Sequence, residues 1–230
     1  MKLKILGVIF LALLLSSCGT RPAPMSKKVQ QKLTTVDSSL IITQSNLDVT
    51  LHNSTNIQGH GLLGALVSVA IDSARQSYAQ NKAKPMMKTL QKYDFREVML
   101  KSMNQSFAKL KKINMKLPVK LDTIGTDLSK KVFYDNAKGD AILLCNARYR
   151  YASSNLHIYL DARIYPKSEA LKLLRKNPND QKTFDNSNTI YYNSFVFKKE
   201  GVTAENIQVS LDEAAANLIK QLSMDLDHGI

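Results

Sequence analysis

The side chains that could carry out acid–base or nucleophilic chemistry are few in this chain and lie far apart. It has four histidines and two cysteines. None of them falls in the spacing of a zinc site, a nucleophile elbow or a Ser-His-Asp arrangement. The histidines are His52, His60, His157 and His228. The sequence therefore predicts no catalytic residue, no metal site and no cofactor, and favours a protein that is not an enzyme.

Cys145 lies in an apolar segment, residues 141–147, that is typical of a buried strand. A nucleophilic cysteine needs partial exposure and a neighbouring group that lowers its pKa. The sequence shows neither feature beside Cys145. We therefore expect a buried, unreactive thiol.

The other cysteine, Cys18, ends a segment of different composition. Lys2 and Lys4 precede an apolar run over residues 5–15, and two serines follow it. The run is too short to cross a bilayer, which takes about 20 residues. A positive head, a short apolar run and small residues are the layout of a secretory signal peptide.

The end of this segment, Leu15-Ser16-Ser17-Cys18, resembles the lipobox of bacterial lipoproteins. The resemblance implies that residues 1–18 are a lipoprotein signal peptide and that Cys18 carries diacylglycerol and palmitate. In enterobacterial lipoproteins an aspartate after the cysteine favours the inner membrane. Gly19 takes that position here, so the resemblance implies the outer membrane, with the domain on its periplasmic side.

The charge of the chain is strongly positive, with 32 Lys+Arg against 19 Asp+Glu. Much of the excess lies in residues 82–120, where only Asp94 and Glu97 oppose the basic residues. Such a region suits anionic lipid or an acidic cell-wall polymer, or it is a solvated face whose lysines maintain solubility. No stacking motif of aromatic and basic residues is present, so we expect no nucleic acid partner.

The elements before residue 115 follow from composition and periodicity. Residues 19–28 contain two prolines and no apolar period, which predicts a flexible tether before a domain over residues 29–230. Two strand-like runs within residues 33–53 predict a hairpin. Residues 61–84 predict a buried helix, and apolar spacing predicts an amphipathic helix over 95–111.

The clearest sheet signal lies in the second half of the chain. The pattern predicts strands over 141–151 and 156–165 joined by a tight turn, with the first half of the first strand covered on both faces. Further elements are expected as strands over 115–121 and 189–198, short helices over 126–136 and 167–176, and a last helix that begins at the capping box Ser210–Glu213. The order predicts an α+β fold, with an antiparallel or mixed sheet packed against three or more helices in a single mature domain.

Arginines and tyrosines concentrate on the predicted hairpin. These residue types are enriched at the energetic centres of protein interfaces, although they also form stabilising pairs on solvent-facing sheets. The sequence therefore predicts a candidate partner surface formed by Arg148, Tyr149, Arg150, Tyr151, Tyr159, Arg163 and Tyr165.

These observations favour a lipid-anchored, non-enzymatic protein that binds or scaffolds another component of the bacterial cell envelope. One alternative is an accessory lipoprotein of envelope lipid transport, which would need a groove lined by residues 62–71 and 95–110. Another alternative is a hydrolase or cell-wall enzyme whose site the sequence does not reveal.

Overall fold

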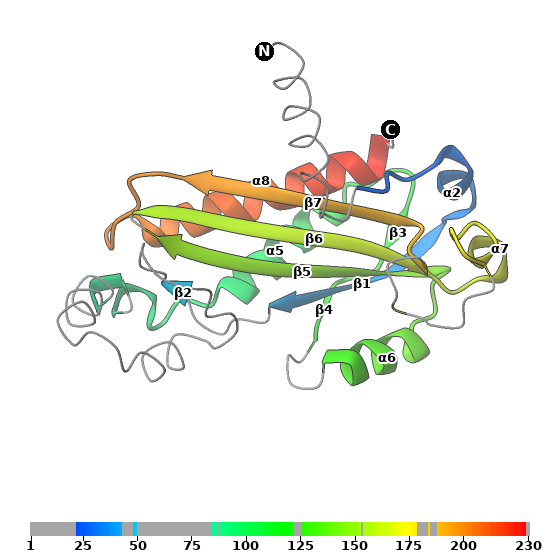
Figure 1. The fold of residues 1–230 in the computed structure, drawn as a ribbon, viewed down its shortest axis with the longest axis horizontal. Coiled ribbons are helices and arrows are strands. Elements are labelled where there is room, and N and C mark those ends of the chain that lie inside the picture. The colour runs from blue at the N-terminus through cyan, green and yellow to red at the C-terminus, as the bar shows by residue number, and fades with distance from the viewer. Residues whose placement is uncertain are drawn as a thin grey trace, which may run out of the picture.

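A mixed sheet of seven strands forms the centre of the described structure, and two long helices lie together on one of its faces (Figure 1). The structure, a computed structural model, describes residues 22–42, 48–49, 84–86, 88–121, 126–152, 154–178, 184 and 188–228. The arrangement confirms the predicted α+β fold. The predicted buried helix over 61–84 lies outside the described residues except at Lys84.

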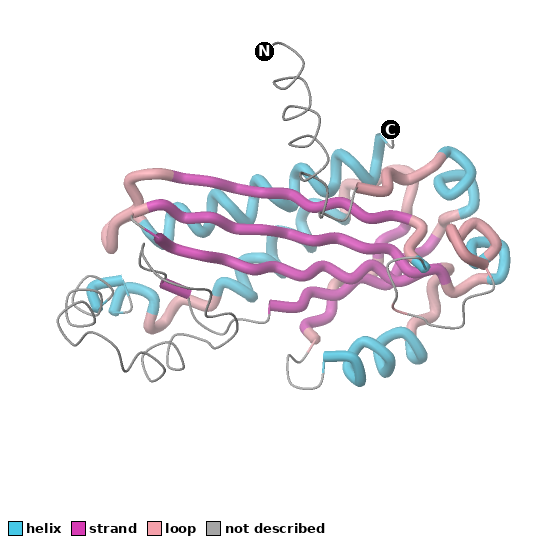
Figure 2. The backbone as a smooth tube through the Cα atoms, viewed as in Figure 1, coloured by secondary structure: helices cyan, strands magenta, loops and turns pink. Residues whose placement is uncertain are grey.

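The strand order is β3-β1-β5-β6-β7, with β2 beside β5 and β4 beside β1. Figure 2 shows the three long strands β5, β6 and β7 side by side, and they are antiparallel to one another. The strands are β1 (Thr35–Ile42), β2 (Asp48–Val49), β3 (Asn114–Met115), β4 (Val119–Lys120), β5 (Ala141–Ala152), β6 (Asn155–Pro166) and β7 (Tyr191–Lys199). The helices are α2 (Lys27–Lys32), α5 (Phe95–Phe107), α6 (Thr126–Asn136), α7 (Glu169–Lys172) and α8 (Ile207–His228).

The predicted hairpin within residues 33–53 is wrong. β1 and β2 both pair in parallel with β5, with Ile42 opposite Ala147 and Asp48 opposite Arg150. They therefore follow one another along the same side of β5 instead of pairing with each other. Local composition indicates that a segment is extended, but the strand it pairs with is set by contacts distant in sequence.

β5 is covered on both faces over its first half, as predicted. Leu143 and Cys145 belong to the main core on the side of α5 and α8, while Ile142 and Leu144 pack on the opposite face with Phe133 of α6. Cys145 is fully buried, which confirms the expectation, and this burial raises the pKa of its thiol.

α5 begins at the predicted position, where the Asp94 side chain accepts a hydrogen bond from the Arg96 N–H at 2.9 Å. Its apolar stripe of Phe95, Met99, Met103 and Phe107 is at most 5 % exposed and belongs to the main core. An accessory of lipid transport is expected to have a groove lined by residues 62–71 and 95–110, and only the second of these segments is described. Because these side chains are packed in the core, they line no open groove.

The last helix starts earlier than its capping box predicts. Ser210 lies inside α8, is fully buried, and donates its hydroxyl to the Asn206 carbonyl at 2.8 Å. Asn206 directly precedes α8, and its Oδ1 accepts from the Thr203 N–H at 2.8 Å, which fixes the turn before the helix. The earlier start buries Ile207 completely, and that apolar contact favours the extra turn.

The domain also begins earlier than predicted, because residues 23–28 are folded. Ala23 exchanges two backbone hydrogen bonds with Tyr192, at 2.8 and 2.9 Å. Met25 is 1 % exposed and lies in the main core, and Ser26 caps α2. The predicted tether is therefore wrong over these residues. A segment this short, which contains Pro24 and follows Pro22, has no period that could reveal its burial.

Asp140 joins the turn before β5 to the start of β1. Its carboxylate accepts from the Thr34 hydroxyl and from the backbone N–H groups of Thr34 and Thr35, the latter at 3.0 Å. These hydrogen bonds, the one from the Thr34 hydroxyl above all, hold the pKa of the Asp140 carboxyl below its ordinary value.

Replacing Asp140 with asparagine is expected to lower the free energy of unfolding at pH 7 by about 1 kcal/mol, because the site is partly exposed. A lowered native pKa stabilises the fold at pH values above the unfolded pKa, near 3.8. That stabilisation is lost as the pH falls through the native pKa. The gap between wild type and D140N in urea unfolding should therefore stay constant from pH 7 to about pH 5 and narrow as the pH falls below about 4. The control D127N, at a side chain that is 92 % exposed, should show no such closing gap.

Candidate partner-binding surface

The alternation of β5 divides the predicted partner surface between two faces of the sheet. Successive side chains of a strand point to opposite faces, so Arg148 and Arg150 lie on one face and Tyr149 and Tyr151 on the other. The Tyr149 ring is 5 % exposed and makes an edge-to-face contact with Phe95 at 5.4 Å.

The Tyr151 hydroxyl lies on the same side and donates to the Val202 carbonyl at 2.8 Å. These contacts place Tyr149 and Tyr151 toward the main core. Their inclusion in the partner surface is therefore corrected: both tyrosines anchor β5 to the helix side of the sheet.

Tyr165 is a second correction. It points away from α5 and α8, as the alternation of β6 predicts, but it is only 3 % exposed. It packs with Ile142 and Leu144, and its ring makes an edge contact with Phe184 at 5.4 Å. The sequence gives the direction of this side chain correctly. It does not reveal that α6 and Phe184 pack over this end of the sheet.

Beyond α6, the same side of β5, β6 and β7 carries no described helix (Figure 1). We call this surface the open face. Its members share their outward direction and are adjacent across the three strands: Asn146, Arg148, Arg150, His157, Tyr159, Asp161, Arg163, Tyr192, Ser194, Val196 and Lys198. The predicted residues Arg148, Arg150, Tyr159 and Arg163 are thus brought together.

The open face includes residues that are not part of the partner surface predicted from the sequence. Tyr192, Val196 and Lys198 lie opposite Arg163, Tyr159 and His157 respectively. The alternation within residues 191–199 is a signal that they share one face. Their position beside the arginines depends on the pairing of β6 with β7, which local sequence does not specify.

Two arginines of the open face lie over aromatic rings, and one of them also pairs with a carboxylate. Arg148 pairs with Asp161 at 2.9 Å, and its guanidinium lies 6.0 Å from the centre of the Tyr159 ring. Arg163 lies 4.7 Å from the centre of the Tyr192 ring. Stacked guanidinium groups keep a planar set of donors that suits carboxylates and other anions. The face therefore has the chemistry to bind an acidic protein surface.

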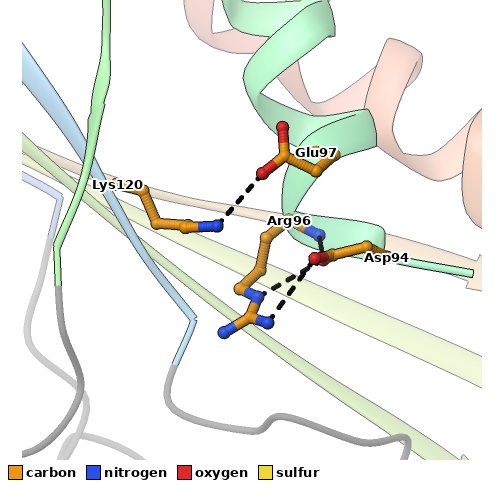
Figure 3. Close-up of polar contacts among 4 residues, drawn as sticks. All are labelled: Asp94, Arg96, Glu97 and Lys120. Carbon is orange, nitrogen blue, oxygen red and sulfur yellow. Dashed lines mark hydrogen bonds and ion pairs between the residues drawn. The ribbon is translucent and has the colours of Figure 1, made fainter.

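The predicted basic region, residues 82–120, lies elsewhere. Its two acids are each paired with a basic neighbour: Asp94 contacts Arg96 at 3.3 Å and Glu97 contacts Lys120 at 3.1 Å (Figure 3). The other described lysines lie in the segment before α5, on α5, in the turn after it and along the β3–β4 edge. Lys82 lies outside the described residues. The region is spread over several elements and is separate from the open face.

The remaining residues singled out from the sequence do not converge. Cys18, His52 and His60 lie outside the described residues. The His157 ring lies 6.5 Å from Tyr159 on the open face, and His228 ends α8. Among the residues that the structure describes, no three His, Cys, Asp or Glu side chains group as metal ligands. No helix in this part of the chain combines the length and the apolar character needed to cross a membrane.

Comparison with known proteins assigns no family to the chain. No family model matches it, and no curated protein matches it. Among solved structures, the protein XCC0632 from Xanthomonas campestris, of the family DUF330, is similar with a TM-score of 0.34 and 10 % identity. The similarity covers 89 % of this chain and 93 % of that chain. A similarity at this level carries no conclusion about fold or function.

Proposed function

We propose that this protein is a lipid-anchored component of the bacterial cell envelope, attached through Cys18 at the periplasmic side of the outer membrane. In this proposal it acts without catalysis, by binding another envelope protein through the open face. The lipobox-like residues Leu15 to Cys18 support the location. The open face supports the mode of action.

The proposal that the protein binds a partner rests on the amino-acid composition of the open face. A solvent-facing sheet needs only polar side chains, yet here Arg148 lies over the Tyr159 ring and pairs with Asp161. Arg163 lies over the ring of Tyr192, which is itself only 8 % exposed. Arginine and tyrosine are enriched at interface hot spots because they combine large contact area with specific polar groups.

Lipid attachment is tested by replacing Cys18 with serine in the cells that make the protein. We expect the wild type in the membrane fraction, with acyl groups on its first mature residue by mass spectrometry. The C18S variant should lose this modification. A wild-type chain without acyl groups would contradict this part of the proposal.

Binding is tested with a photoreactive amino acid in place of Tyr159, in the middle of the open face. We expect crosslinking in cells to capture one specific envelope protein, and reversal of the neighbouring charge in R148E to reduce its yield. A photoreactive residue at Val209, which is 57 % exposed on α8, is the matched control. Equal capture from both positions, or none from Tyr159, would contradict the open face as the binding surface.

A further inference from the structure

The first folded residues lie very close to the proposed lipid attachment point. Ala23 is fastened to Tyr192 by two backbone hydrogen bonds. Only residues 19–22 separate it from Cys18. Five residue steps span at most about 17 Å. A lipid on Cys18 would therefore keep this end of β7 and the neighbouring elements near the membrane surface.

The elements next to this point form a basic corner. α2 begins four residues after Ala23 and packs against α7. Figure 1 shows α2 and α7 at the same end of the molecule. We call the surface of residues 27–32 and 169–178 the α2–α7 corner. It contains Lys27, Lys28, Lys32, Lys172, Arg175 and Lys176, and its one acidic residue is Glu169.

The charges of the corner are available to a membrane surface. Lys27, Lys28, Lys32 and Lys176 are exposed. The single acid is already neutralised, because Glu169 pairs with Lys172 at 2.7 Å. Basic residues near an anionic bilayer surface are attracted to it.

The corner also presents an apolar side chain. Leu173 follows α7 directly and is 71 % exposed, although the neighbouring Leu171 is fully buried. An exposed leucine between basic residues suits the boundary between headgroups and acyl chains, where the leucine enters the apolar layer and the cations stay at the phosphates. The open face also carries charge, but its exposed apolar side chain, Val196, is only 41 % exposed.

From this combination we propose that the α2–α7 corner is the membrane-contacting surface of the protein. It binds anionic phospholipid headgroups of the leaflet that holds the lipid on Cys18 and inserts Leu173 among them. The inference rests on the proposed lipid attachment. It orients the domain with the end of the sheet formed by Tyr192 toward the bilayer, and it leaves the open face for a protein partner.

The test uses the mature lipoprotein in vesicles of phosphatidylethanolamine with 0 or about 30 % phosphatidylglycerol. An environment-sensitive fluorophore is attached at L173C. Cys145 does not compete for the label because it is buried, and Cys18 does not compete once it is acylated. We expect a blue-shifted emission and strong quenching by a headgroup-bound quencher, and both effects should be larger with phosphatidylglycerol.

The control label is placed at L117C. Leu117 is 75 % exposed and follows Lys116 at the β3–β4 edge, so it is also an exposed leucine beside a lysine. It belongs to the basic region 82–120, which is the competing membrane surface. We expect little quenching there. Stronger quenching at L117C than at L173C would overturn the proposal.

Charge reversal supplies the second arm. K27E/K28E should reduce quenching at L173C about tenfold or more, because two attractive charges become repulsive. K101E/K109E has the same net charge and alters α5 and the turn after it, so it should leave the signal unchanged. Equal effects of the two pairs, or none from K27E/K28E, would overturn the proposal. The mass of the first mature residue shows separately whether the lipid is present. The experiment therefore distinguishes a protein without the proposed lipid from a lipidated protein whose α2–α7 corner does not contact the membrane.

Discussion

Replacing Gly139 with alanine is expected to destabilise the fold by about 2–3 kcal/mol. An added Cβ at this position would lie 2.7 Å from the Thr35 carbonyl oxygen and 2.8 Å from Asp37 Oδ2. Neither neighbour is free to move away. The Thr35 carbonyl accepts a hydrogen bond from the Asp140 N–H at 2.8 Å. Asp37 Oδ2 accepts from the Gly139 and Lys138 N–H groups at 2.6 and 3.1 Å.

The measurement is urea unfolding at pH 7, and Gly201 gives the matched control. Gly201 has a φ of +67°, and an added Cβ would meet nothing within 4 Å. G201A should therefore cost only the strain of a left-handed alanine, about 1 kcal/mol. A G139A variant as stable as G201A would show that the contact between the turn and β1 is not tight.

Replacing Met25 with alanine is expected to lower the free energy of unfolding by about 2–4 kcal/mol. Met25 is 1 % exposed and packs in the main core, so its removal leaves a cavity and loses apolar contacts. In a flexible tether the same substitution would have no effect on stability. The result therefore decides where the folded domain begins.

Met224 offers a matched methionine for this comparison. It lies on α8 and is 50 % exposed, so M224A should change the stability by less than about 0.5 kcal/mol. Thermal unfolding of both variants in one buffer is sufficient. If M25A and M224A melt together, residues 23–28 are not held in the core.

The position of the domain boundary determines how far the folded domain can move from Cys18. A tether over residues 19–28 would let the domain move up to about 35 Å from Cys18, whereas a domain fixed at Ala23 is limited to about 17 Å. If Cys18 carries the proposed lipid, the shorter reach keeps the end of the sheet at Tyr192 near the membrane.

Local patterns were sufficient for the elements that bury one regular stripe. The alternation over residues 156–165 predicts the inward row of β6, and Leu156, Ile158 and Leu160 are all fully buried. The four-residue spacing of Phe95, Met99 and Met103 likewise predicts the core side of α5. In each case the positions of the apolar residues repeat with the period of the element, so they identify its buried side.

Local patterns failed where burial depends on a segment distant in the chain. Met25 has no periodic neighbours that would reveal its position in the core. Tyr165 points outward in the pattern of β6 but is covered by α6 and Phe184. β1 and β2 have strand composition, yet their shared partner, β5, lies about 100 residues further along the chain.

The sequence by itself determined the class of the fold, most of its elements, the buried state of Cys145 and the expectation of a lipid on Cys18. Only the tertiary structure decided which arginines and tyrosines share a surface, where the domain begins and which corner lies beside the attachment point. The physical reason is that a period of 2 or 3.6 residues states which side of an element is apolar. It does not state which element covers that side, and the chain settles that choice only when distant segments pack together.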